Sequence, residues 1–102
     1  MLDRLTVADF EPLCGSAFRG ELPGTGQLEL GLIAAKTLPG SPPQTDGGVR
    51  RHPFSLVFRV RTPLRLPQGI YPLEHDRLGR LDIFLVPVGR DADGLLLEAI
   101  FA

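Results

Sequence analysis

The feature that most constrains the fold is an alternation of apolar and polar residues with a period of two. It is clearest in FSLVFRVR, residues 54–61. Successive side chains of a β-strand point to opposite faces, so this pattern predicts a strand with one face in a core. The residues predicted to face inward are Phe54, Leu56, Phe58 and Val60, and those predicted to face outward are Ser55, Arg59 and Arg61.

Five further segments show strand patterns, and turn residues separate most of them. They are residues 16–22, 27–38, 70–75, 80–88 and 95–102. Ile33 follows Leu32 directly, and this slip in the alternation predicts a β-bulge near residues 31–33. Twelve glycines and ten prolines supply turns, including PGTG at residues 23–26. Short strands at this spacing predict a mainly β fold, a small antiparallel six-strand sandwich or barrel.

The length of 102 residues predicts a single β-domain covering residues 1–102. Residues 37–52 are rich in proline and glycine and have no periodicity, so we expect a long loop there. A short helix is expected at residues 6–13, with Thr6 as its cap and Asp9 completing a capping box. Residues predicted to form the core are Phe18, Leu30, Phe54, Leu56, Phe58, Leu81, Ile83 and Leu97.

Charge and composition exclude several classes of protein. The formal net charge is −1, which predicts no nucleic-acid or membrane partner. The apolar runs are far shorter than the roughly 20 residues that span a bilayer, and the acidic start is unlike a signal peptide. We therefore expect synthesis in the cytoplasm. Cys14 is the only cysteine, so no internal disulfide forms, and we expect a small buried side chain.

Two polar clusters are candidate sites. Asp91, Asp93 and Gly94 resemble the start of a calcium loop, but Asp-Gly between two strands is the usual chemistry of a hairpin turn. Glu74 and Asp76 share one face of a strand, while His75 points to the other. No nucleophile motif or metal-ligand spacing accompanies them, so we expect no catalytic residue, no metal and no cofactor.

Arginine is concentrated in one acid-free segment between Asp46 and Glu74. Arg59 and Arg61 lie on one face of a predicted strand, and their planar guanidinium groups suit carboxylates and phosphates. One hypothesis is that they recognise an acidic partner. The alternative is pairing with carboxylates of neighbouring strands. The carboxylates considered for such pairing are Glu29, Asp82 and Glu74.

Several phrases of the sequence are similar to a known family. They are LTVADFEPLCGSAF, PFSLVFR, LPQGIYPLEHDRLG and FLVPVGRDADG with EAIF after it. With these phrases the chain resembles a family of small bacterial proteins catalogued only as a domain of unknown function. The resemblance supplies no activity and no catalytic residues. Genes of this family often lie near genes for phage-tail-collar-like proteins. The resemblance therefore implies an accessory role at a tail or fibre.

The C-terminal hairpin is apolar on both faces. A two-layer β-domain normally buries one face and exposes the other to water, and one short helix is too small to cover the second face. We therefore expect the residues of that second face to contact another protein chain. They are Phe84, Val86, Leu96 and Ile100. The partner is either a second copy, forming a homodimer, or a tail-collar-like protein.

The sequence thus favours a non-enzymatic interaction or assembly module, with Arg59 and Arg61 added to the contact. The alternative is a small ligand-binding or catalytic β-barrel. Its site would consist of Glu74, His75 and either Arg59 or Arg61 around a pocket.

Overall fold

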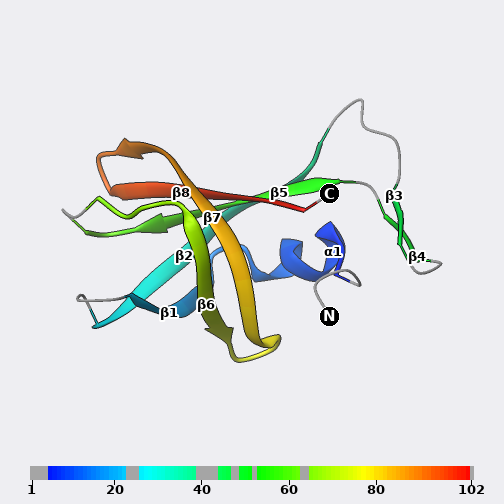
Figure 1. Cartoon of the computed structure of the whole chain (residues 1–102), viewed down its shortest axis with the longest axis horizontal. Coiled ribbons are helices and arrows are strands. Elements are labelled where there is room, and N and C mark those ends of the chain that lie inside the picture. The colour runs from blue at the N-terminus through cyan, green and yellow to red at the C-terminus, as the bar shows by residue number, and fades with distance from the viewer. Residues whose placement is uncertain are drawn as a thin grey trace.

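The six predicted strands form a closed antiparallel barrel in the computed structural model of the chain. The structure describes residues 5–22, 26–38, 44–46, 49–51, 53–62 and 65–101. The barrel strands are β1 (Ala17–Leu22), β2 (Gly26–Thr37), β5 (Phe54–Val60), β6 (Gly69–His75), β7 (Gly79–Asp91) and β8 (Gly94–Phe101). Their order around the barrel is β1-β2-β5-β8-β7-β6 (Figure 1). A barrel, rather than a sandwich, is therefore the correct form of the prediction.

Part of the segment expected to be a long loop forms a small hairpin instead. β2 continues to Thr37, and β3 (Gln44–Asp46) pairs with β4 (Val49–Arg51) as a separate two-stranded sheet. Strands of three residues are too short to show a period of two, which is why the sequence pattern did not reveal them. The remainder of residues 37–52 lies outside the described residues, except Leu38. Most of the predicted PGTG turn lies outside them too, since only Gly26 is described.

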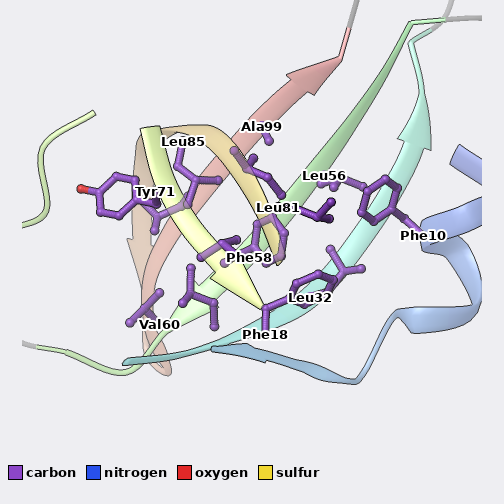
Figure 2. Close-up of a cluster of buried hydrophobic side chains, with 14 of the residues drawn as sticks. Phe10, Phe18, Leu32, Leu56, Phe58, Val60, Tyr71, Leu81, Leu85 and Ala99 are labelled. Carbon is purple, nitrogen blue, oxygen red and sulfur yellow. The ribbon is translucent and has the colours of Figure 1, made fainter. Parts of the chain in front are cut away.

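The eight residues predicted to form the core are all buried, none more than 3% exposed. Figure 2 shows side chains from several strands meeting inside the barrel. The Phe18 and Phe58 rings pack edge to face, with centroids 5.3 Å apart. Each strand contributes alternate residues to this interior and turns the others to the outside, as the pleat of a β-strand requires.

The N-terminal helical segment closes one end of the barrel. It consists of α1 (Val7–Phe10) followed by a 3₁₀ turn, Glu11–Leu13. The predicted capping box is present, and the Thr6 backbone N–H donates to the Asp9 carboxylate at 2.7 Å. Phe54 and Phe101 stack on each other, and Phe10 packs against both rings at centroid distances of 5.8 and 5.6 Å. No helix of the described residues is long and apolar enough to cross a membrane.

Cys14 is exposed, so the expectation of a buried cysteine was wrong. The residue lies in a turn directly after the 3₁₀ turn, where the core already receives Leu13. Position in a turn, and not the apolar character of the side chain, decides its exposure.

Two irregularities bend the long strands. The predicted bulge is present, because the register between β2 and β5 shifts between Leu32 and Ala34. A second shift, between Pro87 and Gly89, bends β7 against β8. β7 pairs with β6 from Gly79 to Leu85, and with β8 from Val86 to Asp91. The first half of β7 is therefore not paired with β8, and the two strands diverge at one end of the barrel (Figure 1).

Candidate functional site

The outer face of the C-terminal hairpin remains exposed. Phe84 and Ile100, on β7 and β8, keep 51% and 55% of their surface accessible. Val86 and Leu96, on the same outer face, are partly buried. The helical segment covers none of this face, because its Phe10 packs against the inner side of the sheet through Phe101. The four residues predicted to contact a partner are thus on the surface or at its edge.

Glu98 occupies a particular place on this face. Its neighbours across the two adjacent strands are Val57 of β5 and Val86 of β7. It is partly buried, and the structure shows no hydrogen bond or ion pair from its carboxylate to any described residue. Covering a carboxylate without giving it a partner is costly. Any molecule that covers this face must therefore bring a positive or hydrogen-bond-donating group to Glu98.

Arg59 is paired within the chain. Its Nη2 and Nε donate to Oδ2 of Asp91 at 2.7 and 3.1 Å. The other oxygen of Asp91 accepts the backbone N–H groups of Asp93 and Gly94. The predicted hairpin turn is therefore present at DADG, and Asp91 organises it while also binding Arg59. The guanidinium group lowers the pKa of the Asp91 carboxyl, and this carboxylate raises the pKa of Arg59.

The partner of Arg59 is not one of the three carboxylates considered from the sequence, which were Glu29, Asp82 and Glu74. β8 lies between β5 and β7, so Asp91 is not on a strand adjacent to Arg59. The turn between β7 and β8 carries the carboxylate to the guanidinium. The Arg59–Asp91 contact depends on where the β7–β8 turn lies relative to β5. The pattern of neighbouring residues in the sequence does not show this.

The Arg59–Asp91 pair predicts a specific acid dependence of stability. Because folding lowers the pKa of Asp91 below its ordinary 3.8, the pair's contribution is complete above that pH and is lost as pH falls through the lowered value. Asp91→Asn should remove this part of the acid sensitivity. Urea titrations at several pH values measure it. Asp93→Asn, which changes a neighbouring carboxylate without this ion pair, is the control, and equal pH profiles for both variants would contradict the assignment.

Arg61 differs from Arg59. It is exposed, and within the described parts of the chain it has no hydrogen bond or ion pair. It borders an open depression of about 500 Å³ beside the β7–β8 turn, together with Thr62 and Arg90. Nη1 of Arg90 donates to the Thr62 carbonyl at 2.6 Å. Asp91 and Asp93 line the same depression, so its charges are mixed and favour no anionic ligand.

His75 is buried and makes two hydrogen bonds. Its Nδ1 accepts the backbone N–H of Arg77 at 3.0 Å, which leaves the proton on Nε2. Nε2 therefore donates to Oγ of Ser16, 2.9 Å away, and that hydroxyl donates to the Leu13 carbonyl. A catalytic pair needs the opposite polarity, with the histidine accepting the serine proton. The ring also packs on Phe18 at 4.4 Å, so His75 ties β6 to the start of β1.

The sequence did not reveal Ser16, because 59 positions separate it from His75. Glu74 and Asp76, which flank His75, are exposed, and Asp76 pairs with Arg19 at 3.0 Å. Among the described residues no group of histidine, cysteine, aspartate and glutamate side chains can hold a metal ion.

The alternative site is not brought together. β5, which carries Arg59, and β6, which carries Glu74 and His75, are three strands apart in either direction around the six-strand barrel. They lie on opposite sides, so their outward-facing side chains point away from each other. The His75 ring lies in the interior between them. The residues combined in the alternative hypothesis therefore line no common pocket.

Comparison with known proteins identifies one family. The family described as Domain of unknown function (DUF6916) matches residues 5–101, which is nearly the whole chain. No curated protein and no solved structure matches.

Proposed function

We propose that this chain, which belongs to the family Domain of unknown function (DUF6916), is an interaction module that binds another protein chain. The contact surface is the outer face of β7 and β8, with Phe84 and Ile100 among its exposed apolar side chains. One observation carries the proposal. Val57, Val86, Leu96 and Ile100 surround a partly buried carboxylate, Glu98, that has no partner among the described residues. An apolar face of this kind is a common mark of a protein interface.

The chemistry of the polar groups supports a role in binding. The Ser16–His75 hydrogen bond has the wrong polarity for nucleophilic catalysis. Asp91 accepts hydrogen bonds from Arg59 and from the backbone of the β7–β8 turn. Arg61, which has no ion pair within the described parts of the chain, is the remaining arginine of the predicted contact. The resemblance to proteins near phage-tail-collar-like genes extends the proposal to a tail- or fibre-associated assembly.

Phe84→Asp combined with Ile100→Asp is expected to abolish this association, because each change places a charge where an apolar contact forms. Both side chains point outward, so the free energy of unfolding should change little. The measurement is affinity capture from the native cell, using wild-type and variant protein as bait, with mass spectrometry of the captured chains. Sedimentation of the purified proteins reports self-association in parallel.

The matched control is Gln27→Asp, which places a charge at an exposed position of β2, at the end of that strand away from residues 34–37. β2 lies opposite β7 in the barrel. The control should keep the partners of the wild type. Partners retained equally by the control and by the Phe84 and Ile100 double variant would show that the outer face of β7 and β8 is not the binding surface.

A further inference from the structure

Three strands extend past the point where the barrel closes. β1 pairs with β2 as far as Gly31, and β7 pairs with β8 as far as Glu98. Beyond these residues β2, β5 and β8 continue as a three-stranded section made of residues 34–37, 54–57 and 98–101. Phe10 of α1 packs on its inner side, against Phe54 and Phe101. The outer side carries Ala34, Lys36, Ser55, Val57, Glu98 and Ile100.

Two charges of opposite sign stand at opposite corners of this outer side. Lys36 lies next to Ser55, and Ser55 lies next to Ile100, while Glu98 is one same-face position from Ile100 along β8. With strands about 4.8 Å apart and a rise of about 3.4 Å per residue, the Cα atoms of Lys36 and Glu98 are about 12 Å apart. Lys36 is exposed and, like Glu98, has no ion pair with any residue that the structure describes.

The described cation that lies beside Glu98 in the strand register is already occupied. Arg59 lies diagonally across from Glu98, because Arg59 pairs with Leu96 and Val57 pairs with Glu98. Its guanidinium group is bound to Asp91 through two hydrogen bonds. When its face is covered, Glu98 therefore needs a cation or hydrogen-bond donor that none of the described residues supplies.

We propose that a second copy of this chain covers the section, with Lys36 of each copy pairing with Glu98 of the other. The inference rests on the proposed function and names its partner. A two-fold axis that lies in the plane of the contact and crosses the Lys36–Glu98 line at right angles at its midpoint places each charge opposite its counterpart in the other copy. Both ion pairs then form at once. The same axis passes close to Ile100, so the two Ile100 side chains meet at the centre of the contact.

A second copy satisfies the charge pattern without any further requirement. A different protein would need a cation and an anion at the same spacing, in the reverse order, on an apolar surface. This chain has that pattern on itself. A stable interface buries about 800 Å² on each partner, which is more than the section alone provides. The contact therefore continues onto Leu96 and Val86, the same-face neighbours of Glu98.

Charge reversal tests the pairing. Glu98→Lys and Lys36→Glu, each made alone, turn both ion pairs of the dimer into like-charge contacts, and each should raise the dimer dissociation constant at least about tenfold. The double variant, with both changes in one chain, restores both pairs and should bring the constant back to within about threefold of wild type. Sedimentation velocity over a concentration series measures these constants.

A mixture of the two single variants gives the sharper result. In a heterodimer of Glu98→Lys with Lys36→Glu both contacts are again between opposite charges, so two chains that remain monomeric alone should associate when mixed. The control replaces Glu98→Lys by Glu74→Lys, an equal charge change on β6, opposite β5. The Glu74→Lys chain still dimerises with itself, but its heterodimer with Lys36→Glu keeps one like-charge contact. A labelled Lys36→Glu chain should therefore bind Glu74→Lys more weakly than it binds Glu98→Lys.

Different failures point to different errors. A wild type that stays monomeric would overturn the two-fold pairing, and the capture experiment with the Phe84 and Ile100 double variant would still decide the proposed function. A dimer disrupted by Phe84→Asp with Ile100→Asp, but unaffected by reversal at Lys36 or Glu98, would keep the interface and overturn the pairing. Binding of labelled Lys36→Glu to Glu74→Lys as tight as its binding to Glu98→Lys would also overturn it.

Discussion

Phe58→Ala is expected to lower the free energy of unfolding by about 3–5 kcal/mol. The side chain is fully buried on β5, the strand that pairs with both β2 and β8, and its ring packs edge to face on Phe18. Truncation removes apolar contacts and leaves a cavity in a barrel interior whose walls are tied by strand pairing and cannot collapse freely. Urea or guanidinium titration of purified protein measures the loss.

The matched control is Phe84→Ala, which removes the same side chain from the outer face of β7. Because Phe84 is half exposed, its loss should cost less than about 1 kcal/mol in the monomer. If the two variants were destabilised equally, the inward and outward faces of these strands would have to be reassigned.

Gly94→Ala is expected to be at least as damaging, with a loss of about 4 kcal/mol or more. Gly94 begins β8 with φ at +150°, a conformation that other residues rarely adopt. A Cβ at this position would lie 2.3 Å from the carbonyl oxygen of Val60 and 2.9 Å from its carbon. Both atoms belong to the backbone of β5, so relief requires moving a central strand or opening the turn. Thermal and urea unfolding report the loss.

Gly89→Ala is the control for Gly94→Ala. Gly89 lies in β7, where an added Cβ would meet no atom within 4 Å, so stability should change by less than about 1 kcal/mol. A well-folded Gly94→Ala protein of wild-type stability would show that the β7–β8 turn does not approach β5 as closely as described.

The strands, the helix cap and the bulge were predictable because each depends on neighbours in sequence. Alternating side chains in FSLVFRV follow from the pleat of one strand, and the Thr6–Asp9 box involves residues three positions apart. The phase slip at Ile33 is likewise a local signal, and it coincides with the observed register shift. The Asp-Gly turn also follows from local chemistry, although the contact between Gly94 and Val60 does not.

The sequence predicted which residues form the candidate surface. It did not predict which strands and charges lie next to them. The two-faced hairpin pointed to Phe84 and Ile100, and the structure leaves both exposed. The role of Glu98 depends on which strands flank it and on what holds Arg59. These are facts of strand order, so neither the isolation of Glu98 nor its relation to Lys36 is visible in the sequence.

By itself the sequence determined that the chain makes six strands, each with an apolar face, because a period of two and the intervening turns are properties of neighbouring residues. Only the tertiary structure decided that these strands close into a barrel, since closure depends on β1 meeting β6 through just two residue pairs, at Arg19–Glu74 and Gly20–Leu73. Closure also decided which charges are paired, because it places residues from distant segments on adjacent or opposite strands. The bound Arg59, the buried His75 and the unpaired Glu98 follow from that arrangement.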